Sequence, residues 1–205
     1  NLASVTDARG NAFSYEYDDL GRGTSVGYAD GTASRSAYDA AKGDLVKSTN
    51  RRGQQISYQY DERGELVKTT WPDGRTFTLT RDAKGNVVEA TDTLTGTVTM
   101  EYDASERLTK ITYPKGRGFT YTYDAAGRIL SRTTLDGALA QKYVYDAFGR
   151  LARLTDGNGN LYLENAYDAA TGELVRQAYG NGTSTETLAA DGTVLVNIKS
   201  FTDAE

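Results

Sequence analysis

The sequence contains no cysteine and no histidine, and only two prolines. Without cysteine, neither a disulfide framework nor a Cys-based zinc site can form. Without histidine, every mechanism that uses imidazole as a base or as a metal ligand is excluded. The lack of cysteine does not select a compartment, because a large sheet protein can be secreted without disulfides.

Long apolar runs and excess positive charge are also missing. No run approaches the roughly 20 apolar residues of a membrane span. The net charge of −5 argues against binding to nucleic acid or to an anionic membrane surface. No signal peptide is visible, and the first residue is Asn1 rather than Met. The sequence is therefore interpreted as an excerpt of a longer protein or as a processed product.

Glycine and tyrosine are abundant. The chain has 22 Gly, 15 Tyr, 5 Phe and 1 Trp in 205 residues. A disordered chain would lack such aromatic content. Tyrosine has an apolar ring and a polar tip, which suits the half-wet face of a sheet. The length is within the range of a single all-β domain.

The dipeptide Tyr-Asp recurs at a nearly constant spacing of 21 or 22 residues. Such an internal repeat is the signature of a repeat architecture. Arg81-Asp82 fills the one gap in the series. The seven copies are Tyr17-Asp18, Tyr38-Asp39, Tyr60-Asp61, Tyr102-Asp103, Tyr123-Asp124, Tyr145-Asp146 and Tyr167-Asp168.

Each repeat begins with a segment in which apolar and polar residues alternate. Phe119-x-Tyr121-x-Tyr123 shows the pattern, with threonine at the positions between. A period of two predicts a half-buried β-strand. The same pattern occurs in Phe13-x-Tyr15-x-Tyr17, Ile56-x-Tyr58-x-Tyr60, Phe77-x-Leu79-x-Arg81 and Val98-x-Met100-x-Tyr102.

The repeat Asp begins a four-residue turn that ends in Gly. Asp in the first position and Gly in the fourth predict a type I turn, in which the Asp carboxylate accepts a backbone N–H and Gly tolerates the left-handed conformation. Two copies, which begin at Asp39 and Asp168, carry one extra residue. The regular copies pair Asp18 with Gly21, Asp61 with Gly64, Asp82 with Gly85, Asp124 with Gly127 and Asp146 with Gly149.

A Leu-led or Ile-led return strand and a second turn, such as Pro72-Asp73-Gly74, complete each repeat. Residues 183–205 are interpreted as a degenerate end that turns at Asp191-Gly192. The sequence thus predicts a single array over residues 1–205, with about eight or nine hairpins. The expected fold is an all-β, spiralling and curved antiparallel sheet, because a twisted sheet of this width does not stay flat.

The motif Tyr-x-Tyr-Asp-x-x-Gly-Arg-Leu, at residues 143–151 and in similar form at 121–129, resembles the YD repeat. That repeat occurs in bacterial Rhs proteins, in the shell components of Tc insecticidal toxins and in teneurins. The resemblance implies a hollow β shell. In the bacterial members the shell encloses a C-terminal toxin, whereas in teneurins a similar barrel belongs to an adhesion protein.

Two parts of the Rhs family are missing from this sequence. It contains no Asp-Pro segment of the kind linked to self-cleavage, and no variable toxin domain follows the repeats. The resemblance therefore extends only to the wall of such a shell. We expect no catalytic residue, cofactor or metal in this segment.

Several residues suggest more specific functions, such as catalysis or calcium binding. The carboxylates recur at equivalent positions, which indicates a structural role, since an active site needs one special place. Residues 156–160 begin like a calcium-binding EF-hand loop, but Leu161 and Tyr167 occupy the places of the required Gly and Glu. We therefore interpret this segment as a hairpin turn.

The tyrosine rows could bind sugars, although cross-strand aromatic pairs also stabilise a sheet. The Arg that follows the turn Gly is expected to pair with Asp or Glu of a neighbouring hairpin. Its functional alternative is a charged inner surface that contacts cargo. These arginines are Arg22, Arg107, Arg128 and Arg150.

Three functions remain open. The favoured one is a shell or scaffold segment of a secreted or surface protein, whose partners are other repeats and a C-terminal effector domain of the same parent. The alternative is an adhesion or carbohydrate-binding module that contacts glycans or a receptor. The third is an assembly part that pairs its open sheet edges with other chains.

Overall fold

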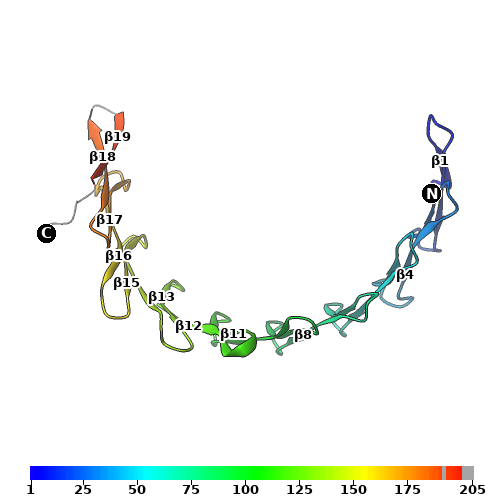
Figure 1. Cartoon of the computed structure of the whole chain (residues 1–205), viewed down its shortest axis with the longest axis horizontal. Helices are drawn as coiled ribbons and strands as arrows, with labels where there is room; N and C mark the ends of the chain where they lie inside the picture. The colour runs from blue at the N-terminus through cyan, green and yellow to red at the C-terminus, as the bar shows by residue number, and fades with distance from the viewer. Residues whose placement is uncertain (191–192, 200–205) are drawn as a thin grey trace. The chain divides into compact units, whose positions relative to one another are not determined.

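The computed structural model describes residues 1–190 and 193–199, with side chains through Thr183. The chain divides into two compact units, residues 1–99 and 100–205. In both units, the described residues form β-strands joined by tight turns (Figure 1). The single 3-10 helix among them is η1 (Pro114–Gly116). The described residues contain no helix with the length and apolar character needed to span a bilayer.

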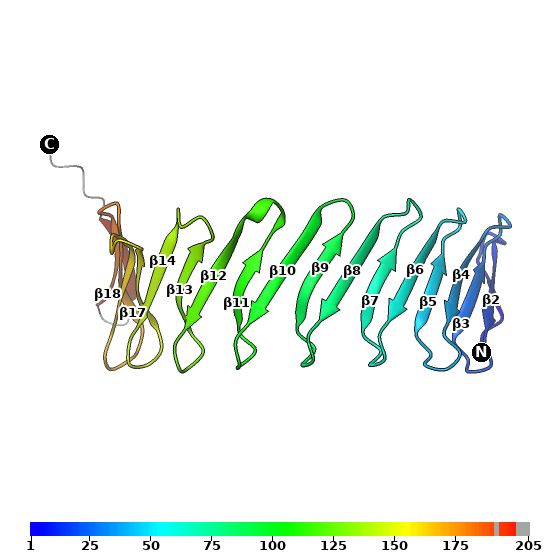
Figure 2. The same cartoon turned by 90° about the horizontal axis from the view of Figure 1, so that it is seen from below.

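The first unit is a row of hairpins in which each strand pairs antiparallel with its neighbours in the chain (Figure 2). Its last strand, β10 (Gly96–Tyr102), continues past the boundary at Thr99. The other strands are β1 (Ser4–Thr6), β2 (Ala12–Tyr17), β3 (Gly23–Gly27), β4 (Ala33–Tyr38), β5 (Leu45–Thr49), β6 (Gln55–Tyr60), β7 (Leu66–Thr70), β8 (Thr76–Arg81) and β9 (Val87–Asp92).

The second unit repeats this arrangement, again with antiparallel pairing between consecutive strands. Its strands after β10 are β11 (Leu108–Thr112), β12 (Gly118–Tyr123), β13 (Ile129–Thr134), β14 (Ala140–Tyr145), β15 (Leu151–Asp156), β16 (Leu161–Tyr167), β17 (Leu174–Tyr179), β18 (Ser184–Ala190) and β19 (Thr193–Lys199).

The prediction of an all-β fold made of tandem antiparallel hairpins is confirmed. The alternating segment that ends at Tyr123 is β12, and the Leu-led segments are the return strands. Strands β18 and β19 pair with one another in the degenerate end, while the turn expected at Asp191-Gly192 lies outside the described residues. That residues 1–205 form one array stays a prediction.

The strand register shifts at the residue before the repeat Asp. Between β12 and β13, Thr122 lies opposite Ser131 but Tyr123 lies opposite Ile129, so Leu130 is an extra residue. A bulge of this kind accompanies hairpin turns that end in a left-handed Gly, and it strengthens the local twist. The same shift occurs at Tyr17, Tyr38, Tyr60, Arg81, Tyr145 and Tyr167.

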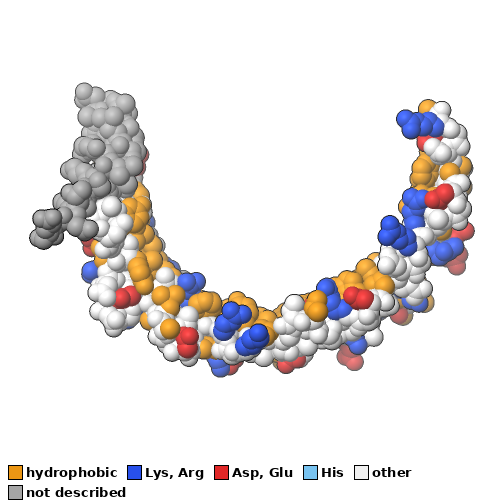
Figure 3. Space-filling view, viewed as in Figure 1, with side chains coloured by type: hydrophobic (Ala, Val, Ile, Leu, Met, Phe, Trp, Pro, Cys, Tyr) orange, Lys and Arg blue, Asp and Glu red, His pale blue; other side chains and the backbone are white. Residues whose placement is uncertain are grey.

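The described part of the chain has almost no buried core. Among the side chains through Thr183, the buried ones are Thr69, Thr155 and Ala178. Hydrophobic side chains instead gather along one face of the sheet in each unit (Figure 3). Because no second layer covers this face within a unit, the sheet depends on contacts between adjacent hairpins.

Candidate functional site

The Asp-x-x-Gly segments form the hairpin turns at one end of the strands. In the copy at Asp124, the Gly127 N–H donates to the Asp124 carbonyl over 3.0 Å, and the Asp124 N–H donates to the Arg128 carbonyl over 2.9 Å. Gly127 has a φ of +83°, in the left-handed region. Turns with the same two hydrogen bonds begin at Asp18, Asp61, Asp82, Asp103 and Asp146.

Three motif positions depart from this pattern. The turns at Asp39 and Asp168 are one residue longer, and the N–H groups of Gly43 and Gly172 donate to the Asp carbonyls. In the turn at Asp103, Glu106 stands where the other copies have Gly and adopts a φ of +64°. A left-handed backbone costs a residue with a side chain roughly 1–2 kcal/mol, so this turn is strained.

The Asp carboxylate holds its own turn closed. In the copy at Asp124, Oδ1 accepts the N–H groups of Ala126 and Arg128, each over 2.9 Å, and Oδ2 accepts Nε of Arg128 over 2.7 Å. The backbone N–H of Arg128, and then its guanidinium, lower the pKa of Asp124 below the usual value, against the effect of desolvation.

The Arg after the turn connects its hairpin to the next one. The guanidinium carbon of Arg128 lies 4.6 Å from the ring centre of Tyr145, which precedes the Asp of the following repeat. The Tyr145 hydroxyl donates back to the Ile129 carbonyl over 3.0 Å. We call this arrangement of Asp and Arg from one hairpin with Tyr from the next the inter-repeat clasp.

The clasp recurs wherever the sequence has Arg directly after the turn and Tyr before the Asp of the next repeat. Arg22 stacks on Tyr38, Arg107 on Tyr123 and Arg150 on Tyr167, at 4.6, 4.9 and 4.1 Å. Two of the arginines also reach the next turn, since Nη1 of Arg107 donates to the Asp124 carbonyl over 2.9 Å and Nη1 of Arg150 to the Gly172 carbonyl over 2.8 Å.

The expected pairing of these arginines with carboxylates of a neighbouring hairpin is wrong. Each forms its ion pair with the Asp of its own turn, four residues earlier, at 2.6–2.7 Å. The neighbouring hairpin contributes the tyrosine ring instead. A guanidinium on an aromatic face is worth roughly 0.5–1 kcal/mol at an exposed site.

The one repeat that has Arg in place of Tyr keeps the connection with exchanged chemistry. Arg81 takes the Tyr position, and the preceding hairpin has Glu65 where the four hairpins with a clasp have Arg. Nε of Arg81 lies 2.8 Å from Oε2 of Glu65. An ion pair thus replaces the stacked pair at the same junction.

This exchange predicts a thermodynamic coupling. We expect Glu65→Arg alone and Arg81→Tyr alone each to lower the melting temperature, because the first places two arginines together and the second leaves Glu65 facing a phenol. The double variant should recover most of the loss, because it recreates the clasp beside Asp61. A cycle of four thermal melts should give a coupling of roughly 1 kcal/mol, and additive effects would contradict the proposed junction.

The predicted motif tyrosines all lie at strand ends. The hydroxyls of Tyr38, Tyr60, Tyr123 and Tyr167 donate to carbonyls of the preceding return strand over 2.6–3.2 Å. Tyr17 ends β2 and Tyr102 ends β10. Burial raises the pKa of Tyr60, Tyr123 and Tyr145. The pKa shifts of the aspartates and these tyrosines thus lead away from neutrality, which is opposite to what acid–base catalysis near pH 7 requires.

The segment that begins like a calcium loop is the turn between β15 and β16. Oδ1 of Asp156 accepts the N–H groups of Asn158 and Asn160, each over 2.8 Å, and Oδ2 accepts Nδ2 of Asn160 over 2.7 Å. Gly159 has a φ of +95°. The Asp156 carboxylate therefore closes a turn in the same way as the repeat aspartates do.

The repeat geometry agrees with comparisons to known proteins. The family model for the teneurin YD-shell matches residues 42–185, and the model for the RHS repeat matches residues 1–33. The chain belongs to the YD-shell family. No curated protein sequence matches it.

Solved Tc toxin structures have a similar fold. The crystal structure of TcdB2-TccC3-TEV shares 19% identity over 90% of this YD-shell chain, with a TM-score of 0.60. That of TcdB2-TccC3 without the hypervariable C-terminal region shares 17% identity over 94%, with a TM-score of 0.61. The chain spans 11% and 13% of the length of those two chains.

Proposed function

We propose that this YD-shell chain is a wall segment of a hollow shell that encloses a C-terminal effector domain of the same parent protein. The observation that carries the proposal is the uncovered apolar face, since each unit is one sheet layer whose hydrophobic side chains gather on one side (Figure 3). A sheet normally buries such a face against another layer. Cargo enclosed by the wall would cover this apolar face.

The inter-repeat clasp supports a structural role for this segment, without catalysis. It engages the motif Asp and Arg with each other inside one turn, and the Arg with the Tyr of the next hairpin, in contacts that stabilise the sheet. We further propose that the parent protein acts outside the cell, as a secreted or surface protein. One of the similar structures is TcdB2-TccC3 without its hypervariable C-terminal region, and a variable region in that position of TcdB2-TccC3 supports an effector there.

The sugar-binding alternative is less well supported. A sugar would need the faces of the tyrosine rings, yet a guanidinium lies over the rings of Tyr38, Tyr123, Tyr145 and Tyr167. The hydroxyls of these four tyrosines donate to backbone carbonyls. These four tyrosines are therefore engaged within the sheet.

The intact parent protein provides the test. We expect electron cryomicroscopy to show a closed shell with density inside it, and we expect protease to spare the C-terminal domain in the native particle. A parent with Arg128→Ala and Arg150→Ala, which opens two clasps, should lose that protection sooner. A solid interior, or a C-terminal domain that lies outside the particle and is cleaved at the same rate in both proteins, would contradict the proposal.

A further inference from the structure

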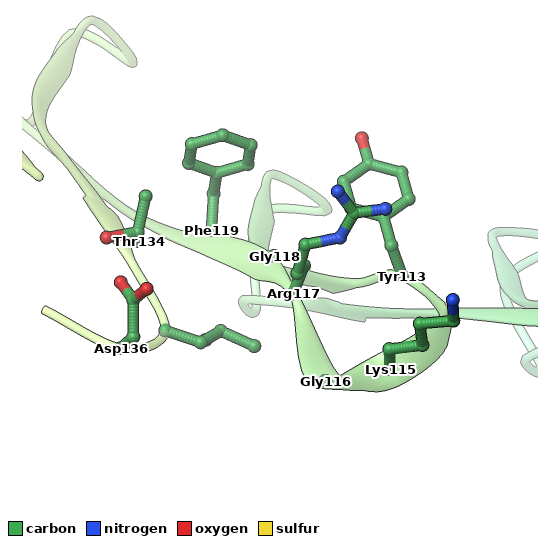
Figure 4. A pocket seen from close by; sticks show the side chains of 9 residues that line it. Tyr113, Lys115, Gly116, Arg117, Gly118, Phe119, Thr134 and Asp136 are labelled. Carbon is green, nitrogen blue, oxygen red and sulfur yellow. The ribbon is translucent and has the colours of Figure 1, made fainter. Parts of the chain in front are cut away.

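A hollow lies at the strand ends opposite the clasps, beside the turn that contains η1. It has a volume of about 440 Å³, within the range of roughly 300–1,000 Å³ that is typical of ligand pockets. Tyr113, Phe119 and Leu135 give it apolar walls. Figure 4 shows Tyr113, Arg117 and Phe119 projecting from the β11–β12 hairpin, with Thr134 and Asp136 coming from the end of β13.

In the corresponding turn at Trp71, two nearby carboxylates balance the positive charge of Arg75. Arg75 stacks on Trp71 at 4.1 Å, and its Nε lies 3.7 Å from Oδ2 of Asp92. Asp73 accepts the Arg75 N–H over 3.0 Å. The guanidinium in this turn therefore has both an aromatic ring and a carboxylate within the sheet.

The turn at Tyr113 has the same framework but lacks both acids. Pro114-Lys115-Gly116-Arg117 corresponds to Pro72-Asp73-Gly74-Arg75, so Lys115 replaces Asp73. Thr134, at the same 17-residue distance from the Arg, replaces Asp92. Among the side chains that the structure describes, no carboxylate forms an ion pair with Lys115 or Arg117.

Arg132 adds a third positive charge beside the hollow. Its guanidinium carbon lies 4.9 Å from the ring centre of Phe119, one of the apolar walls. Its Nε is buried and has no hydrogen-bond partner among the described residues, and, unlike Nε of Arg75 and Arg81, it has no carboxylate in an ion pair there. An unsatisfied buried donor costs roughly 1–3 kcal/mol or more when it is charged. An acceptor from a bound molecule would remove that cost.

The charge at this place is opposite to that of the chain. The lining of the hollow contains Lys115 and Arg117 but one carboxylate, that of Asp136, which accepts the Ala138 N–H over 3.0 Å. The whole chain carries a net charge of −5. Lys115 is also held at a φ of +68°, a conformation that costs a lysine roughly 1–2 kcal/mol. Apolar walls with local positive charge complement a ligand that is apolar and anionic.

We propose that this hollow binds an acidic peptide segment in which an apolar side chain is flanked by carboxylates. The apolar side chain enters between Tyr113, Phe119 and Leu135, and the carboxylates meet Arg117 and Arg132. The site is independent of the proposed enclosure, because it lies at the hairpin turns.

Fluorescence anisotropy with the whole chain and a labelled peptide of sequence Gly-Glu-Phe-Asp-Gly tests the site. We expect saturable binding with a dissociation constant on the order of 0.1–1 mM, since a short peptide loses much freedom on binding. The Gly-Gln-Phe-Asn-Gly peptide should bind about tenfold more weakly. Equal binding of the two peptides, no saturable binding, or complete competition by millimolar inorganic phosphate would overturn the proposal.

Variants that introduce the two missing acidic side chains provide a more specific test. Thr134→Asp and Lys115→Asp should each weaken binding of the acidic peptide at least about fivefold, because they supply the carboxylates found at Asp92 and Asp73. Arg9→Asp, in an exposed turn far along the chain, changes the net charge as Lys115→Asp does and should leave binding unchanged. Circular dichroism melts check that all three variants fold. Binding as in the original chain by both acid variants would refute the site.

Discussion

Gly127→Val is expected to lower the melting temperature by roughly 4–8 °C, since about 2 kcal/mol in a chain of this size corresponds to that range. Gly127 has a φ of +83°, and no atom lies within 4 Å of where a Cβ would be. The cost therefore comes from the left-handed backbone, which is worse for a β-branched side chain. Gly149→Val should cost more, because a Cβ there would also lie 3.0 Å from Nη1 of Arg128 in the clasp. Thermal melts followed by circular dichroism measure both losses.

Gly23→Val is the matched control. Gly23 begins β3, its φ is outside the left-handed region, and nothing lies within 4 Å of its missing Cβ. Valine suits an extended strand, so this variant should be as stable as the original chain or slightly more so. If Gly127→Val melted at the same temperature as Gly23→Val, the left-handed turn would have no energetic importance.

The strands and turns could be predicted because their signals are local. Alternation in Phe119-x-Tyr121-x-Tyr123 has a period of two, which only a strand satisfies over this length, and β12 covers these residues. Asp124 and Gly127 signal a turn through their own side-chain and backbone preferences. Since the repeat recurs every 21 or 22 residues, each correct assignment carried over to the other copies.

The partners across hairpins could not be predicted, because they depend on register. Arg128 lies four residues after Asp124 in sequence, but it meets Tyr145 only through the pairing of β13 with β14, in which Ser131 lies opposite Lys142. Glu65 and Arg81, which form the replacing ion pair, lie 16 residues apart, so in the sequence they appear as two unrelated departures from the motif. Only the nearly constant spacing of 16 or 17 residues between each motif Arg and the next Tyr could have suggested the contact.

Glu106 and the hollow were missed for different reasons. Glu106 is the fourth residue of a turn that normally needs Gly. Its N–H donates to the Asp103 carbonyl over 3.0 Å, and this hydrogen bond holds Glu106 in the left-handed conformation. The surrounding sheet outweighs the local preference there. The hollow combines residues of two adjacent turns that the sequence separates, so no single motif could indicate it.

The repeated aspartates make the sheet sensitive to acid. Backbone N–H groups two to four residues later, with Arg side chains at several turns, lower the pKa values of Asp61, Asp103 and Asp124. The pKa values of Asp39 and Asp168 are lowered in the same way. A group whose folded pKa is depressed stabilises the protein above its unfolded pKa, near 3.9 for Asp, and that stabilisation is lost as the pH falls through the folded pKa. With no histidine in the chain, no imidazole titrates between pH 5 and 7.

The melting temperature is therefore expected to be nearly constant from about pH 7 to about pH 5 and to fall by roughly 10 °C or more by about pH 3, because many similar turns lose their carboxylates over the same range. Asp124→Asn separates the charge from the turn. The amide oxygen can still accept the N–H groups of Ala126 and Arg128, but it cannot form the ion pair with the Arg128 guanidinium. We expect Asp124→Asn to melt below the original chain at pH 7 and the difference to be smaller at pH 3, because the stabilisation by the Asp124 carboxylate is lost as the pH falls toward its lowered pKa. An equal difference at both pH values would show that the ionised carboxylate does not stabilise the clasp.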